Sequence, residues 1–289
     1  MNAWLVAARP PTLLASVAPV VVGSGLAAGQ EVFRWDAAIV TLATAVLLNI
    51  AVNFANDVSD AARGADTEHR IGPPRAVSGG LLAARQVWAG TAVILALACA
   101  GGIYLTAISG PLILGIGAAA IVALLAYTGG PWPYGYHGLG EVFVFVFFGP
   151  AAVVGSRYVH DATIPGEAWL LGAPVGFLAT AILVANNLRD IETDRAAGKR
   201  TLAVILGRRG TRVLYAALVI GAFGVIGVIA LLGLVSPWAS VALAGLPLAV
   251  RPIRVIYRET GGPGLISALK ATAGLHLLVG VLLGVGVAL

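Results

Sequence analysis

The sequence predicts an all-α, polytopic membrane protein with nine transmembrane helices. Hydrophobic residues make up 59% of the 289 residues and charged residues only 11%, whereas an ordinary soluble domain carries roughly 25% charged residues. The mean hydropathy is +0.93. Uncharged stretches repeatedly reach the roughly 20 residues that a helix needs to cross a bilayer. We therefore expect a single membrane domain over residues 1–289, with little chain left for a soluble domain.

Taken in order, the uncharged stretches give nine spans, with Pro and Gly marking the breaks between adjacent helices. They lie at residues 11–29, 37–55, 86–128 divided in two at Ser109-Gly110-Pro111, 139–156, 168–187, 213–250 divided in two at Ser236-Pro237, and 271–289. The first is long enough to be a retained helix rather than a cleaved signal peptide. The fifth and eighth have short uncharged cores, so re-entrant or interfacial helices are the alternative for these two.

Lys and Arg residues are segregated between the loops, as the positive-inside rule predicts. With the amino terminus in the cytoplasm, sixteen of the 18 Lys and Arg residues fall in cytoplasmic loops, and only Arg34 and Arg157 fall outside. Nine spans then place the carboxyl terminus outside. Topology thus explains the net charge of +5, so the charge does not indicate nucleic-acid binding. The single cysteine, Cys99, lies in an apolar run and indicates neither a disulfide nor a metal cluster.

Two acidic segments, residues 53–66 and 186–206, each follow an uncharged stretch. Four predicted spans separate them, so both open on the cytoplasmic face. The first contains Asn53, Asn56, Asp57, Asp60 and Asp66. The second contains Asn187, Asp190, Glu192 and Asp194. Within each segment two aspartates are three or four residues apart, so on a helix each pair shares a face.

Carboxylates gathered at a membrane rim repel one another, and a hard divalent cation between them relieves the repulsion. Mg²⁺ prefers carboxylates, water and phosphate oxygens, so we interpret the two segments as halves of one Mg²⁺-dependent diphosphate site. The expected ligands are Asp57, Asp60, Asp190 and Asp194, with neutral oxygens from Asn56 and Asn187. The diphosphate oxygens would be met by Arg75, Lys199 and Arg200, with Asn53 beside them. The alternative is that these are ordinary solvated loop charges.

An aromatic segment lies between the fourth and fifth spans, on the same face as the acidic segments. It contains Tyr127, Trp132, Tyr134, Tyr136 and His137, followed by Glu141. Aromatic faces stabilise a developing cation, so we expect Tyr127 and Tyr134 to border the reacting centre or an acceptor pocket. The alternative is an interfacial belt, where Trp and Tyr collect in any membrane protein.

These segments resemble the UbiA superfamily of intramembrane prenyltransferases, and within it the branch that prenylates 1,4-dihydroxy-2-naphthoate in menaquinone biosynthesis. The resemblance rests on four stretches: ARPPTL (8–13), NDVSDAARGADTEHRIGPPRAV (56–77), YTGGPWPYGYHGLGEVFVFVFFG (127–149) and NNLRDIETDRAAGKRTLAVILG (186–207). It implies nine helices around a central cavity, capped by two acidic motifs that use Mg²⁺ to hold a polyprenyl diphosphate. It also adds Asp66 as a metal ligand, although this residue follows Asp60 by an unusual six positions.

The resemblance further implies the reaction. A polyprenyl group would pass from its diphosphate to 1,4-dihydroxy-2-naphthoate, with loss of CO₂, to give demethylmenaquinone in the cell membrane. Asp60, Asp190 and Glu141 are the candidates for removing the phenolic proton, and the residues do not choose among them.

Two other functions and one internal repeat stay open at this point. A different aromatic acceptor, such as 4-hydroxybenzoate, would keep every diphosphate residue. A secondary transporter also has repeats and membrane acids, but its acids lie near the midplane, whereas these lie at the rim. Residues 11–128 and 139–257 form a weak four-helix repeat, with helix 271–289 appended.

Overall fold

The computed structural model describes residues 2–65, 72, 74–260 and 262–289, and every regular element in these ranges is helical. The α-helices are α1 (Ala3–Ala8), α2 (Pro10–Gly29), α3 (Trp35–Ala62), α4 (Ala84–Ser109), α5 (Leu112–Ala126), α6 (Gly140–Phe148), α7 (Pro150–Tyr158), α8 (Gly166–Ala196), α9 (Leu202–Leu231), α10 (Leu246–Arg258) and α11 (Gly262–Ala288). Two 3₁₀-helices are also present, η1 (Tyr134–His137) and η2 (Pro237–Gly245). The all-α prediction is confirmed.

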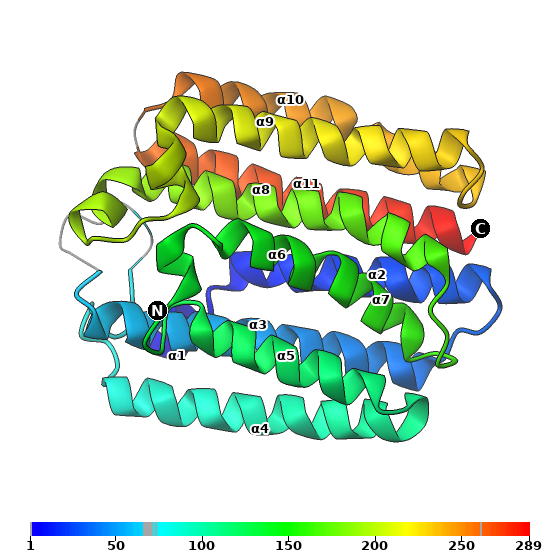
Figure 1. Cartoon of the computed structure of the whole chain (residues 1–289), viewed down its shortest axis with the longest axis horizontal. Helices are drawn as coiled ribbons and strands as arrows, with labels where there is room; N and C mark the ends of the chain where they lie inside the picture. Colours follow the sequence, from blue (N-terminus) through cyan, green and yellow to red (C-terminus); the bar gives the residue numbers. More distant parts are fainter. Residues whose placement is uncertain (1, 66–71, 73, 261) are drawn as a thin grey trace.

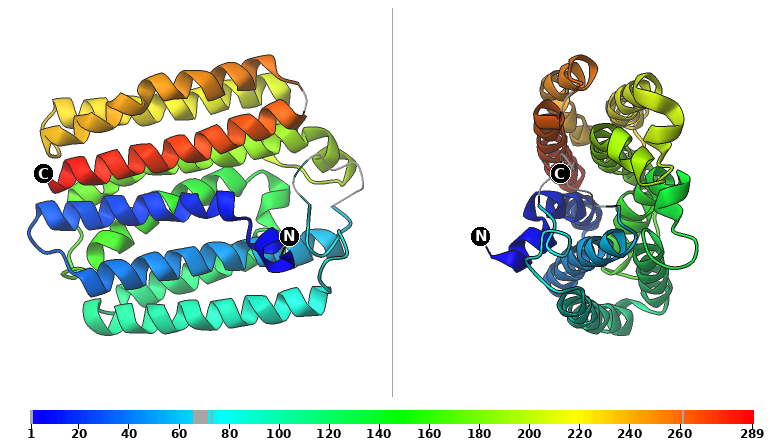
Figure 2. Two further views of the ribbon diagram at one scale, coloured as in Figure 1. Left: turned by 180° about the vertical axis from the view of Figure 1, so that it is seen from behind. Right: turned by 90° about the vertical axis from the view of Figure 1, so that its left-hand side faces the viewer.

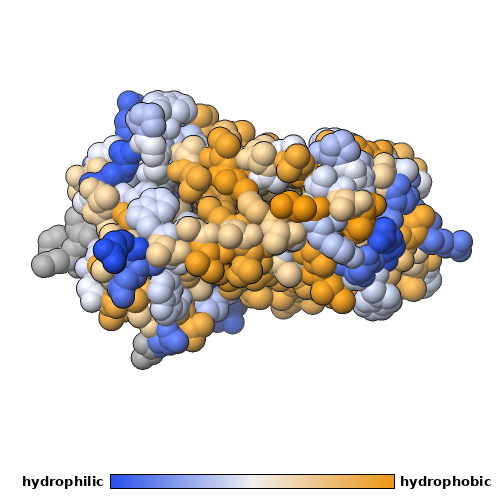
Figure 3. All heavy atoms as spheres, turned by 90° about the horizontal axis from the view of Figure 1, so that it is seen from below, coloured by the Kyte–Doolittle hydropathy of each residue, from blue (hydrophilic) through white to orange (hydrophobic). Residues whose placement is uncertain are grey.

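The length and apolar surface of these helices are those of a multi-pass membrane protein. Among the described residues, eight helical segments are long and apolar enough to cross a membrane, counting α6 with α7 and η2 with α10. The ninth apolar helix, α5, has 15 residues and is therefore about 22 Å long. Figure 3 shows apolar side chains across the middle of the molecule and hydrophilic ones toward both ends. The predicted nine spans are approximately consistent with this structure.

The helices run side by side along the long dimension of the molecule (Figures 1 and 2). α2 packs against α11, α3 against α4, and α8 against α9. A Cβ atom on Gly25 of α2 would lie 2.1 Å from the carbonyl oxygen of Gly284 in α11, so this crossing requires a residue without a side chain. The acidic ends of α3 and α8 both lie at the left-hand end of the bundle in Figure 1. The fold therefore places the two acidic segments at one membrane face.

Several predicted boundaries are wrong because charged residues do not end these helices. α3 continues to Ala62 and α8 to Ala196, so Asp57, Asp60, Asp190 and Asp194 all lie on helices. The segment up to Arg212, predicted as a loop, belongs to α9, which contains a non-helical residue at Gly207 (φ 66°, ψ 175°). α11 begins at Gly262 rather than at residue 271, and α1 was not predicted. In these helix ends the buried carboxylates accept hydrogen bonds from protein donors, while the backbone stays hydrogen-bonded within the helix.

The fifth and eighth spans, whose uncharged cores are short, are the irregular ones. Gly149 separates α6 from α7, and a Cβ atom on it would lie 2.6 Å from the Cα atom of Gly176 in α8. The eighth span starts as the 3₁₀-helix η2 and becomes α-helical only at Leu246. Short apolar cores thus correspond to breaks in the helices rather than to missing spans.

Candidate active site

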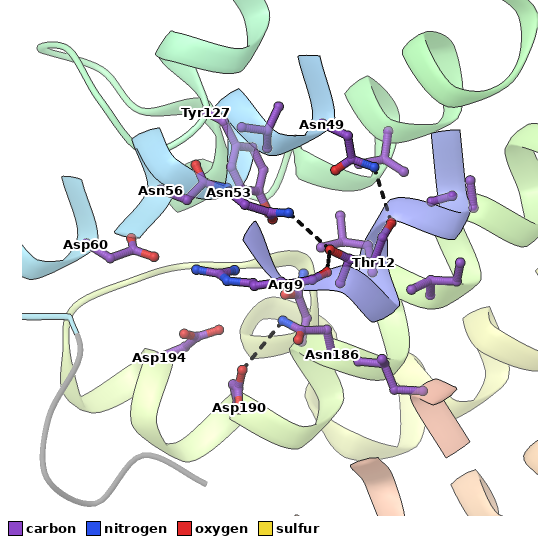
Figure 4. Close-up of a pocket in the computed structure, with 18 of the residues that line it drawn as sticks. Arg9, Thr12, Asn49, Asn53, Asn56, Asp60, Tyr127, Asn186, Asp190 and Asp194 are labelled. Carbon is purple, nitrogen blue, oxygen red and sulfur yellow. Dashed lines mark hydrogen bonds between the residues drawn. The ribbon is translucent and has the colours of Figure 1, made fainter. Parts of the chain in front are cut away.

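A cavity of about 190 Å³ lies between the acidic ends of α3 and α8, and we call it the polar cavity because acids, amides and cations line it alongside apolar side chains. α3 lines it with Asn49, Asn53, Asn56 and Asp60. α8 lines it with Asn186, Asn187, Asp190, Thr193 and Asp194. Several of these side chains recur every four residues, which places them on one face of each helix. The structure therefore brings the two acidic segments to a single cavity (Figure 4).

Asp60 is held by cations and a phenol that come from other segments. Nη2 of Arg75 donates to its Oδ2 at 3.0 Å, and both side chains are buried. The hydroxyl of Tyr136 donates to Oδ1 at 2.8 Å, and Nζ of Lys199 lies 3.7 Å from the same oxygen. The Lys199 ammonium also lies 4.9 Å from the centre of the Tyr136 ring. Asp60 thus joins α3 to three other segments of the chain, which contain Arg75, Tyr136 and Lys199.

Asp190 and Asp194 are held mainly by their own chain neighbours. Nε of Arg189 donates to Oδ1 of Asp190 at 2.7 Å, and its Nη2 donates to Oδ2 at 2.5 Å. The hydroxyl of Thr201 lies 3.4 Å from Oδ2 of Asp194. Charge repulsion among the acids is therefore reduced by cations already built into the protein.

The junction between α1 and α2 is fixed to α3 by two asparagines. The amide of Asn53 donates to the Ala8 carbonyl at 2.9 Å and to the Thr12 hydroxyl at 3.1 Å, and the amide of Asn49 donates to the Thr12 carbonyl at 3.2 Å. Arg9 at this junction has a left-handed backbone (φ 51°), which costs a non-glycine residue free energy. Its side chain extends between Asp60 and Asp194 (Figure 4). Asn53, predicted to lie beside the diphosphate, thus fixes the backbone that carries Arg9.

The remaining predicted asparagines also have protein partners. Oδ1 of Asn56 accepts a hydrogen bond from the Thr128 hydroxyl at 2.8 Å. The amide of Asn187 donates to Oε1 of Glu141 at 2.9 Å. Oε2 of Glu141 is buried and has no hydrogen-bond partner among the described residues. Glu141 is therefore connected to the cavity through Asn187, which lines it.

A second, apolar cavity of about 520 Å³ adjoins the first. It lies among α2 to α7, and Asn49, Val52, Tyr127, Val144 and Phe148 line both cavities. The Tyr127 and Tyr134 rings meet edge to face with centroids 5.3 Å apart. Burial raises the pKa of both phenols, and the charge of Glu141 adds to this effect at Tyr127. Both hydroxyls therefore stay protonated at neutral pH, at or beside the boundary between polar and apolar space.

Among the described residues, the predicted Asp57, Arg200 and Glu141 do not line the polar cavity, and Tyr134 lines only the apolar one. Both carboxylate oxygens of Asp57 accept backbone hydrogen bonds, from Ala76 and Val77. The Arg200 side chain is exposed, and its backbone N–H donates to the Tyr136 carbonyl at 3.0 Å. Asp66 lies outside the described residues.

Four residues at or near the cavity, Arg9, Asn186, Arg189 and Tyr136, make contacts there to which the sequence pattern assigned no role. The spacing of Asn186, Asp190 and Asp194, which repeats every four residues, was a usable signal for Asn186. Arg9 stands within the ARPPTL stretch but gave no chemical signal of its own.

The amino-acid sequence of the chain was compared with known proteins, and the matches show which family it belongs to. Residues 16–286 match the UbiA prenyltransferase family. The chain is 44% identical to the 1,4-dihydroxy-2-naphthoate octaprenyltransferase of Mycobacterium tuberculosis, over 96% of this chain and 93% of that protein. It is 38% identical to the enzyme of the same name from Escherichia coli, over 99% of this chain and 95% of that protein. The chain belongs to the UbiA prenyltransferase family.

Solved structures of UbiA homologues share the fold. The apo structure of the Aeropyrum pernix homologue has a TM-score of 0.69 at 21% identity and covers 95% of this chain and 96% of its own. The Archaeoglobus fulgidus homologue bound to DMAPP and Mg²⁺ has a TM-score of 0.66 at 16% identity and covers 98% of this chain and 99% of its own. At these identities the likeness extends to the fold.

The cavity of this UbiA member has a donor set that suits Mg²⁺. Its carboxylate and amide oxygens are hard ligands. In the described part of the chain, no three His, Cys, Asp or Glu side chains are grouped closely enough to hold a metal ion by themselves. That is compatible with Mg²⁺, which usually keeps several waters and binds through one or two carboxylates together with substrate phosphates.

Proposed function

We propose that this protein transfers a polyprenyl group from a polyprenyl diphosphate to 1,4-dihydroxy-2-naphthoate, with decarboxylation, to give demethylmenaquinone in its reduced, quinol form. The observation that carries this proposal is the pair of adjoining cavities, one lined by acids and cations and the other apolar. A diphosphate head with a long hydrocarbon tail has these two kinds of surface. The names of the relatives at 38–44% identity support the acceptor.

The polar cavity would bind the diphosphate. Arg75 and Lys199 are placed to contact its oxygens, Arg75 through a planar two-point contact and Lys199 as a point charge. Asp60, Asp190 and Asp194 are the proposed metal ligands, with Asn56 and Asn187 as neutral oxygens nearby. When bound there, Mg²⁺ would supply neutralisation of the charge that develops on the leaving diphosphate. Arg9 is a third cation within the same cavity.

The apolar cavity would hold the prenyl chain and exclude water. When the carbon–oxygen bond of the donor breaks, its electron pair leaves with the diphosphate and the allylic carbon becomes cationic. Tyr127, at the boundary between the cavities, presents an aromatic face where that carbon would lie. The surrounding apolar side chains keep water from capturing the cation.

The acceptor then forms the new carbon–carbon bond. Loss of a phenolic proton makes the naphthoate ring electron-rich, the carbon bearing the carboxyl group attacks the allylic carbon, and the carboxyl group leaves as CO₂. Asp60, Asp190 and Glu141 are the proposed proton acceptors. The buried Oε2 of Glu141, which lacks a partner among the described residues, supports Glu141 in particular.

We also propose that the amino terminus and the site face the cytoplasm and that the carboxyl terminus lies outside. The distribution of Lys and Arg supports this orientation. Cysteine labelling from each side of sealed vesicles tests it, using residues introduced near Gly198 and near Leu289.

Prenyl transfer by the purified protein tests the function. The protein in nanodiscs is incubated with Mg²⁺, a polyprenyl diphosphate and either 1,4-dihydroxy-2-naphthoate or 4-hydroxybenzoate, and the products are identified by mass spectrometry. We expect 1,4-dihydroxy-2-naphthoate to give a prenylated product that lacks the carboxyl group, and 4-hydroxybenzoate to give no prenylated product. Transfer to 4-hydroxybenzoate instead would overturn the acceptor, and no transfer to either would overturn the function.

A further inference from the structure

Asp57 and Asp60 are three residues apart on α3, yet their carboxylates have different surroundings. Asp60 lines the polar cavity. Asp57 is 0% exposed and is absent from that lining. Its Oδ2 accepts the backbone N–H of Ala76, and its Oδ1 accepts that of Val77, both at 3.0 Å. Both oxygens thus bind the chain that follows Arg75.

These hydrogen bonds hold a short segment, residues 74–82, against α3. Ala76 is fully buried beside Phe54 and Val58 of α3 and Val87 of α4. A turn follows, in which the N–H of Gly80 donates to the Val77 carbonyl at 3.0 Å. Hydrogen bonds from two backbone N–H groups to a buried carboxylate are charge-assisted and stronger than neutral ones. The position of this segment is therefore strongly specified by Asp57.

Arg75 immediately precedes the two N–H groups that Asp57 holds. Its guanidinium is 9% exposed and donates to Oδ2 of Asp60 at 3.0 Å. Asp57 and Asp60 belong to the same helix. The Asp57 carboxylate fixes the backbone of residues 76–77, and the Asp60 carboxylate accepts the hydrogen bond from the Arg75 side chain. Displacing the Asp57 contacts would move the backbone from which Arg75 reaches the cavity.

We propose that Asp57 is a positioning residue that sets the direction of Arg75, and that it is not a ligand of the metal ion. Its two oxygens are directed at backbone donors outside the cavity, so a metal ion bound there would have to break both hydrogen bonds. This inference rests on the proposed function insofar as Arg75 is assigned to the diphosphate. The assignment of Asp57 to the 76–77 backbone can be tested without that function.

Hydrogen exchange of the Ala76 and Val77 amides is the test that does not depend on activity. Both amides should be protected in the unmodified protein. In Asp57→Asn, whose amide NH₂ cannot accept from a backbone N–H, exchange over 75–78 should accelerate about tenfold or more. Asp60→Asn serves as the matched control and should keep the protection. Unchanged exchange in Asp57→Asn would overturn the proposal.

Metal binding separates a positioning role from a ligand role. Mn²⁺ binding in the presence of farnesyl thiodiphosphate is measured by electron paramagnetic resonance. We expect Asp57→Asn to keep Mn²⁺ affinity within about threefold, and Asp60→Asn to lose at least tenfold. Loss of Mn²⁺ in Asp57→Asn to the extent seen in Asp60→Asn would show that Asp57 is a ligand and would overturn the proposal.

A double-mutant cycle tests the connection to Arg75. Asp57→Asn should raise KM for the prenyl diphosphate about tenfold with the Mg²⁺ concentration for half-maximal rate unchanged. In an Arg75→Ala background the same substitution should add almost nothing. Independent, multiplying effects would contradict action through Arg75. If Asp57→Asn does not yield folded protein, Asp57→Ser is used, since its hydroxyl can accept one of the two hydrogen bonds.

Discussion

The two ends of the helical bundle both gather charged residues, but they use them differently. At the end opposite the cavity, the guanidinium of Arg157 binds both oxygens of Asp161 at 2.6 and 3.1 Å and donates to Gln30 at 2.7 Å. The ring of His160 accepts the backbone N–H of Arg34 at 3.0 Å through Nδ1. These side chains join the end of α7 to the segment between α2 and α3, which contains Gln30 and Arg34.

At the end that contains the polar cavity, charged side chains surround a common space instead. Asp60, Asp190 and Asp194 come from two helices, and Arg75 and Lys199 come from segments outside them. A charge paired with its neighbour contributes mainly to stability, whereas carboxylates and cations that face a common space can exchange partners with a ligand. The difference predicts that substitutions at the cavity change activity, and those at the opposite end change stability.

The largest expected effect is from Asp190→Ala. Removing a carboxylate that we propose as a metal ligand should lower turnover at least about a thousandfold, while the protein stays folded by size-exclusion chromatography. Asp161→Ala at the opposite end is the control and should keep turnover within about threefold of the unmodified protein. Equal losses of turnover in Asp190→Ala and Asp161→Ala would contradict the difference proposed between the two ends of the bundle.

Lys199→Ala should have a smaller effect. Loss of one point charge next to Asp60 should reduce kcat/KM about 10- to 100-fold. Arg195→Ala, which removes an exposed cation paired with Glu192 on the surface of α8, should leave kcat/KM unchanged. A similar loss in Arg195→Ala would mean that general surface charge, rather than the cavity, is responsible.

Tyr136→Phe should have a modest effect. It removes one hydrogen bond to Asp60, worth about 1 kcal/mol, and should lower kcat/KM about fivefold. Tyr104→Phe removes an equivalent hydrogen bond to Asp36 at the other end of α3, and steady-state kinetics should show no change. A drop in activity for Tyr104→Phe alone would reverse the assignment of the two ends.

The smallest effect on activity is expected at His160, where pH should change stability instead. Burial lowers the pKa of His160 to about 4, with the charge of Arg157 adding to the effect. Because the unfolded chain binds a proton near pH 6.5, stability should be full above that pH and decline as the pH falls toward 4. Thermal unfolding between pH 7 and 4 measures this, and His160→Gln should flatten the slope. An unchanged slope would show that His160 is not responsible.

The sequence predicts the membrane class and the meeting of two acidic helix ends at one face. Both follow from sums along the chain: the length of each apolar stretch and the distribution of Lys and Arg among the loops. It did not show which of two neighbouring carboxylates faces the cavity. Asp57 and Asp60 look equivalent in a helical pattern, and only the docking of residues 74–82 distinguishes them. Lys199 and Arg200 also look equivalent in the sequence, but Lys199 lines the cavity whereas Arg200 is exposed. The four-helix repeat stays a prediction.

The most direct test of a single shared site is the binding of farnesyl thiodiphosphate with and without Mg²⁺. Affinity is measured for the unmodified protein, Asp60→Ala, Asp190→Ala and the double variant. If acids from α3 and α8 form one site, either single substitution should abolish the increase in affinity that Mg²⁺ gives, and the double variant should bind no more weakly. Retention of the Mg²⁺ effect in either single variant would contradict the shared site.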